Sequence, residues 1–355
     1  SRRRLRWETL RSKSERSSFM AVDIGKLVAK VKETISFDEL SGKSIAIDAY
    51  NTIYQFISII RQPDGTPLTD SKNMVTSHLS GLFYRSINLM EHGIRPIYIF
   101  DGTPPQLKSK TLEARMSRRE NAYEEWQRAK EKGLLEEART YAMASSRISK
   151  EIIGTSKEVL RLMGIPYIQA PSEGEAQAAN MVKQGLVYAA ASQDYDLFLF
   201  GTDVAIRNLT ITGKRKLPKK NIYVDIGLER IFSKRLLDEF GITRKQLIWL
   251  GILVGTDFDE GIEGIGPMNA LKIVKKYNSI EEIEKYVREK YGRWIDVDAT
   301  EVEQIFENPE VADISGEELE RIQRESKVDK EALTKFMCDE HDFTEERIGK
   351  YIDKL

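Results

Sequence analysis

Seven acidic residues of this sequence are spaced so that they could hold divalent metal ions. They are Asp48, Asp101, Glu173, Glu175, Asp194, Asp196 and Asp257. Short apolar runs that predict β-strands precede Asp48, Asp101 and the Asp194–Asp196 pair, whereas the run before Asp257 is long enough to be a helix. If these strands are parallel, their carboxyl ends share one edge of a sheet, where ligands bind. Oxygen ligands gathered at that edge would select Mg²⁺ or Mn²⁺.

Some of these acidic residues also have a purely structural interpretation. An aspartate after a strand commonly caps the next helix, which applies to Asp48 and Asp101. Residues 172–175 fit a capping box, although a box would use only one of the two glutamates. Asp194 and Asp196 are expected to project to one side at strand spacing. A metal site is favoured because several independent caps would rarely all fall at strand ends of one sheet.

The elements expected to position these residues alternate between strand and helix from Met20 onward. This alternation predicts an α/β fold, a mainly parallel twisted sheet with helices on both faces, in a single domain over residues 20–355. The segment 103–150 breaks the alternation. It holds eleven Lys/Arg against seven Glu and predicts a charged helical insertion. A hairpin with a basic loop is predicted over 205–224, and the pattern is helical from about Ser233 to the end.

The composition excludes several other classes of protein. One cysteine and three scattered histidines in 355 residues predict neither a disulfide nor a zinc site. No apolar stretch reaches the length of a membrane span, and the basic leader at residues 1–19 lacks the apolar core of a secretory signal. We therefore expect a cytoplasmic protein. A net charge of −1 still allows nucleic-acid binding, because metal ions would offset the acidic cluster.

Two further features could contact a nucleic acid. Gly264 and Gly266 lie in a turn before a helix, where backbone amides can approach a phosphate. The cations that could join such contacts are Lys272, Lys275 and Lys276 on that helix, and Lys108, Arg115 and Arg119 on one face of the insertion. An ordinary turn and a solvated basic helix are the competing interpretations. Proximity to the acidic strand ends favours contacts with DNA.

Five motifs in this order resemble the flap endonuclease family of structure-specific 5′-nucleases, nearest to its archaeal members. They lie at residues 48–54, 100–108, 169–176, 191–196 and 255–267. The resemblance runs from Met20 to about Leu355. It implies a PIN-like 5′-nuclease core. It also implies that 103–150 is a helical arch threaded by the free 5′ strand, and that 245–277 is a helix-turn-helix element that grips duplex DNA.

The resemblance also implies roles for individual residues. All seven acidic residues would hold two Mg²⁺ ions, for which Mn²⁺ can substitute, and the glycine turn would bind K⁺. Lys108 and Arg115 would stabilise the attacked phosphate, while Tyr54 would stack on the neighbouring base. Water activated by one metal ion would attack in line, and the other ion would stabilise the leaving 3′-oxygen.

The activity implied is cleavage of 5′ flaps where single-stranded and duplex DNA meet, with 5′–3′ exonuclease activity. This activity would serve Okazaki fragment processing in replication, and repair. The expected partner is DNA with a 5′ flap or nick, bound by a monomer that is nucleoid-associated if archaeal. Two alternatives remain open: a DNA-junction binding protein without turnover, and a Mg²⁺-dependent phosphohydrolase of small molecules.

The sequence departs from the family pattern at both ends. Relatives usually begin with Met-Gly, but here Ala21 follows Met20 and an unfamiliar basic leader precedes both. The sequence ends at Leu355, before the tail motif that binds a sliding clamp in relatives. Clamp binding is therefore expected only of a longer form of the protein.

Overall fold

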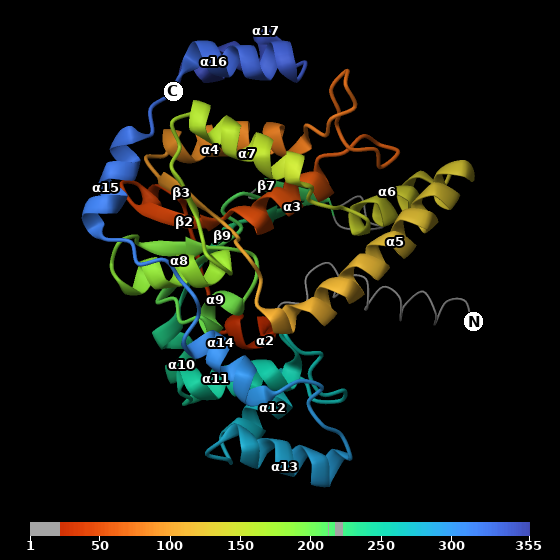
Figure 1. Cartoon of the computed structure of the whole chain (residues 1–355), viewed down its shortest axis with the longest axis vertical. Helices are drawn as coiled ribbons and strands as arrows, with labels where there is room; N and C mark the ends of the chain where they lie inside the picture. Colours follow the sequence, from red (N-terminus) through yellow and green to blue (C-terminus); the bar gives the residue numbers. More distant parts are fainter. Residues whose placement is uncertain (1–21, 212, 217–222) are drawn as a thin grey trace.

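The computed structural model describes residues 22–211, 213–216 and 223–355 (Figure 1). The leader predicted at residues 1–19 lies outside the described residues, as does the centre of the predicted basic loop at 217–222. A seven-stranded sheet lies between two groups of helices. This arrangement confirms the predicted α/β fold.

Five neighbouring strands of the sheet are parallel, and two antiparallel strands extend it on one side. The strands are β1 Glu33–Ile35, β2 Ser44–Asp48, β3 Arg95–Phe100, β4 Tyr167–Gln169, β5 Ala189–Ala191, β6 Val204–Arg207 and β9 Leu228–Phe232. Their order is β1-β9-β6-β5-β2-β3-β4. From β6 to β4 every pair is parallel, while β9 is antiparallel to both β6 and β1. Parallel neighbours require crossover connections, and in this chain helices provide most of them.

Alternation of side chains along the central strands creates a hydrophobic core on each face of the sheet. Ile45 and Ile47 of β2 belong to one core, and Ala46 between them belongs to the other. The first core is covered by α3 Ala49–Ile59, α4 Ser77–Glu91, α7 Lys150–Leu162, α16 Lys330–Thr334, the π-helical segment η3 Lys335–Glu340 and α17 Glu345–Ile352. The helices of the second core include α2 Gly25–Val28, α8 Gly174–Lys183, α9 Asp196–Leu199, α10 Ser233–Phe240, α11 Arg244–Val254 and α14 Ala299–Glu307. Helices on both faces make every central strand fully buried, which explains its continuous apolar sequence.

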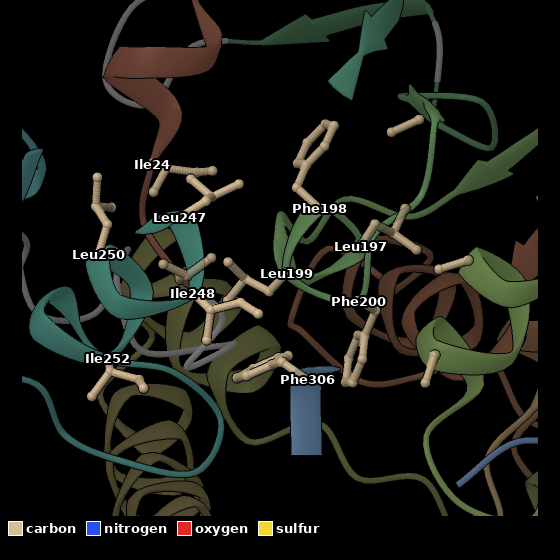
Figure 2. Packing of buried hydrophobic residues seen from close by; sticks show 14 of the residues in the cluster. Ile24, Leu197, Phe198, Leu199, Phe200, Leu247, Ile248, Leu250, Ile252 and Phe306 are labelled. Atoms are coloured by element: carbon tan, nitrogen blue, oxygen red, sulfur yellow. The ribbon is translucent and has the colours of Figure 1, made fainter. Parts of the chain in front are cut away.

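Helices α9 and α11 pack closely although they are distant in the sequence. Figure 2 shows Leu199 of α9 beside Ile248 of α11, with Phe306 of α14 near them. A Cβ atom at Gly251 of α11 would lie 2.9 Å from Leu199 Cδ1, so glycine permits this close approach. The run before Asp257 is therefore a buried helix and not a strand.

The segment 103–150 contains two helices that project from the sheet (Figure 1). A short 3-10 turn, η2 Gln106–Lys108, leads into α5 Ser109–Glu131, and α6 Leu135–Ala144 follows. The two helices pack through Trp126, Ala129, Ala138 and Ala142. Trp126 Nε1 donates a hydrogen bond to the carbonyl of Asp64 at 3.2 Å, which ties α5 to the body of the protein.

The first strand of the hairpin predicted over 205–224 belongs to the main sheet instead. Ala205 and Ile206 are buried in β6, which pairs with β5 and β9 of the main sheet. The antiparallel pair within this range is formed by β7 Gly213–Lys216 and β8 Tyr223–Ile226. The apolar run joined the main sheet because only there can both of its faces be buried.

The chain is helical from Ser233 onward, as predicted. Besides the helices already described, this part contains α12 Pro267–Val274, α13 Ile280–Tyr291 and α15 Gly316–Glu325. Among the described helices of the whole chain, none combines the length and apolar character that crossing a bilayer would need.

Two helix glycines provide a matched test of the packing. A Cβ atom at Gly81 of α4 would meet the Phe56 ring of α3 at 2.2 Å, whereas at Gly154 of α7 it would meet nothing within 4 Å. We expect Gly81→Ala to lower the free energy of unfolding by about 1–3 kcal/mol, because overpacking outweighs better helix propensity. Gly154→Ala should raise it by about 0.5–1 kcal/mol. Chemical denaturation measures both values, and equal effects would contradict the close packing of α4 on α3.

Candidate active site

The carboxyl ends of three adjacent parallel strands bring predicted acidic residues to one edge of the sheet. Strand β2 pairs with β3 on one side and with β5 on the other. Asp48 ends β2, Asp101 directly follows β3, and Asp194 comes three residues after β5. The sheet therefore places these three carboxylates at the same edge, as the sequence pattern predicted.

Asp48 caps a helix and also belongs to this acidic pocket. Its Oδ1 accepts a hydrogen bond from the backbone N–H of Asn51 at 3.0 Å, so that Asp48 is the N-cap of α3. Its Oδ2 accepts one from the hydroxyl of Ser192 at 3.2 Å. The structural and functional interpretations of Asp48 are thus compatible, since each oxygen serves a different partner.

Gly174 allows helix α8 to begin directly against Asp101. The N–H of Gly174 donates to Asp101 Oδ1 at 2.7 Å, and a Cβ atom at this position would lie only 2.6 Å from that oxygen. Glu173 occupies the N-cap position of α8, but its side chain makes no capping hydrogen bond. The capping box considered at 172–175 therefore does not form at this helix, and the buried side chains of Glu173 and Glu175 are available to the pocket.

Asp194 and Asp196 reach the pocket from a loop and a helix start, not from a strand. Tyr195 between them has helical dihedral angles, φ −87° and ψ −1°, and α9 begins at Asp196. Their predicted strand spacing is therefore wrong. Asp194 Oδ2 accepts from Asn51 Nδ2 at 3.3 Å, and Asp196 Oδ1 accepts from the N–H of Val22 at 3.0 Å. The short turn after β5 delivers both carboxylates.

Lys108 and Arg115 enter the pocket from the start of the projecting helices. The ammonium of Lys108 lies 2.7 Å from Glu173 Oε2 and 3.1 Å from Asp257 Oδ2. The guanidinium of Arg115 pairs with the other oxygen of Asp257. Asp257 follows α11, so these two cations connect α5 to an acid from a distant part of the chain. Lys108 is only 7% exposed, which excludes a solvated surface lysine.

Burial and mutual repulsion make the ionised carboxylates costly. For the six acids whose pKa is raised, burial is the largest cause of the increase, and neighbouring acids add to it. The pKa is raised to about 7 for Asp48, to about 6 for Asp101, to about 7 for Glu173 and to about 7 for Asp194, and it is raised well above the ordinary range for Glu175 and Asp196. Burial alone would lower the pKa of Lys108, but the charges of Asp257, Glu173 and Asp101 outweigh it and raise that pKa. The pocket therefore has a strong demand for positive charge.

The donor atoms of the pocket fit a hard divalent cation. All seven predicted ligands supply carboxylate oxygens, the ligands that Mg²⁺ and Mn²⁺ prefer. Glu175 Oε1 is buried without a hydrogen-bond partner, as expected of an atom whose partner is an ion. No group of three or more acidic, His or Cys side chains in the described chain has the geometry of a metal site. Glu173 and Asp257 are instead paired with Lys108 and Arg115.

The remaining predicted contact residues lie in two places. Arg119 of α5 lies over the buried Tyr54 ring, with its guanidinium carbon 5.6 Å from the ring centroid. The glycine turn leads into α12, with Gly264 at φ +90° and Gly266 as the N-cap residue. The lysines Lys272, Lys275 and Lys276 are all exposed on or just after this helix. Arg119 and Tyr54 thus contact each other between α5 and α3, whereas the lysines lie on or just after a separate helix.

Two supporting residues were not identified from the sequence. Asn51 joins Asp48 to Asp194 and also accepts a hydrogen bond from the N–H of Gln193 at 3.2 Å. Ser192 donates to Asp48 and accepts from the N–H of Asp194 at 3.2 Å. The spacing of Asn51 from Asp48 signals only a helix cap. Their partners across the pocket are more than 140 positions away, which leaves no local pattern.

Comparisons with known proteins match nearly the whole chain. Residues 20–122 match the XPG N-terminal domain, and residues 164–257 match the XPG I-region. Flap endonuclease 1 from Pyrococcus furiosus is 52% identical over 337 residues, which cover 95% of each chain.

Solved structures also resemble this chain over most of its length. Flap endonuclease-1 from Methanococcus jannaschii has a TM-score of 0.70 at 38% identity, covering 94% of this chain and 97% of that one. The catalytic core of Rad2 in complex with DNA substrate has a TM-score of 0.66 at 23% identity, covering 94% and 100%. The second likeness concerns the fold alone.

The raised pKa values predict an unusual dependence of stability on pH in metal-free protein. The pKa values of Asp48 and Asp194 in the folded state are about 7, against an ordinary value of 3.8. The folded protein therefore binds more protons than the unfolded chain between about pH 4 and pH 7, and its free energy of unfolding should fall as pH rises through this range. Each such proton contributes a slope of about 1.4 kcal/mol per pH unit. Urea denaturation between pH 5.5 and pH 8 in chelator measures it.

The same measurement in excess Mg²⁺ provides the control. A cation bound by the carboxylates favours their ionised form, so Mg²⁺ should stabilise the protein most at pH 8 and flatten the slope. Stability that rises from pH 5.5 to pH 8 in chelator, with no response to Mg²⁺, would show that these carboxylates do not share one pocket.

Proposed function

Because the chain belongs to the flap endonuclease family, we infer that it is a nuclease that cleaves 5′ flaps where single-stranded and duplex DNA meet. The observation that carries this conclusion is the buried acidic pocket, with Lys108 and Arg115 held inside it. Neither cation is required to build the sheet. Their burial beside carboxylates suits a site that binds a phosphodiester group, because negative charge develops on that group during the reaction.

We propose that Lys108 and Arg115 bind the phosphate that is attacked. Lys108 supplies a compact positive charge, and the planar guanidinium of Arg115 can donate two parallel hydrogen bonds to phosphate oxygens. Both are preorganised by Glu173 and Asp257, so little rearrangement is needed as charge develops. Tyr54 would stack on the base next to this phosphate, with Arg119 at its ring.

The seven carboxylates would hold two Mg²⁺ ions, with Mn²⁺ able to substitute. When bound, two such ions supply activation of the attacking water and stabilisation of the leaving 3′-oxygen. The protein contributes the fixed positions of the ligands. Asn51 and Ser192 restrict Asp48 and Asp194 by hydrogen bonds, and the N–H groups of Gly174 and Val22 orient Asp101 and Asp196. These contacts hold each carboxylate in one orientation for its ion.

We propose that residues 245–277 grip the duplex next to the flap as a helix-turn-helix element. Helices α11 and α12 with the turn at Gly264 and Gly266 provide backbone groups for a phosphate and for a bound K⁺. The exposed lysines of α12 add contacts to the DNA backbone. The 103–150 segment would act as the arch for the free 5′ strand, in a protein that works as a monomer.

Incubation of the wild-type protein with a labelled 5′-flap duplex and Mg²⁺ tests the proposed activity. We expect a single main product cut at the junction, and no product in chelator. Asp194→Asn removes one ligand charge and should abolish cleavage while binding of the same duplex persists. Binding of the duplex by wild type without cleavage would support the alternative of a junction-binding protein. Cleavage of small phosphate esters in place of DNA would support the phosphohydrolase.

Lys108→Ala tests the role of the buried lysine in chemistry. We expect the single-turnover rate to fall about 10²–10³-fold while the Kd for flap DNA changes little, since the charge acts mainly in the transition state. Lys110→Ala removes an exposed lysine two residues away, in the first turn of α5, and serves as the control. If both variants show the same small loss of rate, Lys108 has no special role in the reaction.

A further inference from the structure

Exposed apolar side chains concentrate on the two helices that project from the body. Leu112, Met116 and Tyr123 of α5 are 40%, 54% and 51% exposed, and Leu134 and Leu135 at the turn to α6 are 44% and 54% exposed. In the described part of the chain only three other large apolar residues, Ile59, Met268 and Trp294, are at least 40% exposed. Apolar residues gathered on one surface usually indicate a binding site.

The three residues on α5 form a single row, which we call the α5 stripe (Leu112, Met116 and Tyr123). At 3.6 residues per turn they fall within a sector of about 40°, along about 16 Å of helix. Lys108, Arg115 and Arg119 share a sector centred about 60° away, so the stripe runs beside the face that reaches the acidic pocket. Thr111 and Ala129 are buried, and they lie on the side of this cationic face that is away from the stripe. The α5 stripe is therefore on the open side of the helix.

The neighbouring charges indicate what covers the stripe. Arg119 lies between Met116 and Tyr123 in the sequence and on the edge of the same surface, over the ring of Tyr54. Tyr123 makes an edge contact with Trp126, with ring centroids 5.7 Å apart, which restricts how its ring can turn. Cations beside a restricted aromatic ring and other apolar side chains are typical of surfaces that bind single-stranded nucleic acid, where bases stack without sequence preference.

We propose that the α5 stripe is a stacking surface for the first bases of the 5′ single strand as that strand leaves the acidic pocket. This inference rests on the proposed function, because it takes the reacting phosphate to lie at Lys108 and Arg115. The strand attached to that phosphate then passes along α5, and the stripe begins at Leu112, one helical turn from Lys108. The stripe makes the enzyme sensitive to whether the flap carries bases, independently of the charge of its backbone.

Flap substrates with and without bases test the proposal. In one substrate the first three flap nucleotides are normal, and in the other they are abasic, so that backbone charge is the same. We expect wild type to cleave the abasic flap with kcat/KM lower by about 5-fold to 100-fold, the range expected for losing one or more stacked bases. Met116→Ala and Tyr123→Ala should lower kcat/KM for the normal flap and leave the abasic flap nearly unchanged.

Two variants control for other effects. Tyr123→Phe keeps the ring and should retain the wild-type preference for a flap with bases. Leu135→Ala removes an equally exposed apolar side chain from the far end of the same pair of helices and should behave as wild type. Met116→Ala has no ring contact to lose, so it separates stacking from a structural effect at Trp126.

Several outcomes would overturn the proposal. Wild type that cleaves both flaps equally well has no stacking surface. Variants that lose activity equally on both substrates would show a structural role, and loss of the preference in Leu135→Ala would place the effect elsewhere. A wild-type dimer that Met116→Ala dissociates would assign the stripe to a second copy of the chain. Only failure of wild type to cleave either flap in Mg²⁺ would contradict the proposed function itself.

Discussion

Repulsion between buried carboxylates is the constraint on which the rest of this structure depends. The sheet forces acids from β2, β3 and β5 to one edge, and burial raises the pKa of most of them. Two like charges about 5 Å apart repel by roughly 3 kcal/mol at an effective dielectric constant near 20. The fold must therefore supply positive charge at this edge. Lys108 and Arg115 supply part of it, and divalent ions would supply the rest.

Helix starts supply a further part of that compensation. Asp48 is the N-cap of α3, Glu173 is the N-cap of α8, and α9 begins at Asp196. The amino end of a helix carries a partial positive charge, which stabilises a nearby anion. Three helices thus begin at the pocket because parallel strands are followed by helices at this edge. The same topology that concentrates the acids also directs helix dipoles and backbone N–H groups toward them.

The sequence predicted the fold class and the identity of the acids better than their local geometry. Apolar runs ending in Asp48 and Asp101 are strong local signals, and the structure places both where parallel strands would put them. Asp194 and Asp196 were assigned to strand spacing because alternation alone does not distinguish a strand from a short turn before a helix. Helix propensity alone disfavours glycine at position 174, where its value is the space that it leaves for an oxygen of Asp101. Such close approaches depend on partners far away in the sequence, so no local pattern records them.

The order of the acids along the chain has a consequence for biosynthesis. Six of them lie between residues 48 and 196, but Asp257, which pairs with both cations, follows α11 in a chain of 355 residues. A ribosome must therefore synthesise the chain as far as residue 257 before this pocket can close. Contacts of such long sequence separation form late, because the loop between them must be closed first. Chains that end before Asp257 would therefore lack the acid that pairs with Lys108 and Arg115.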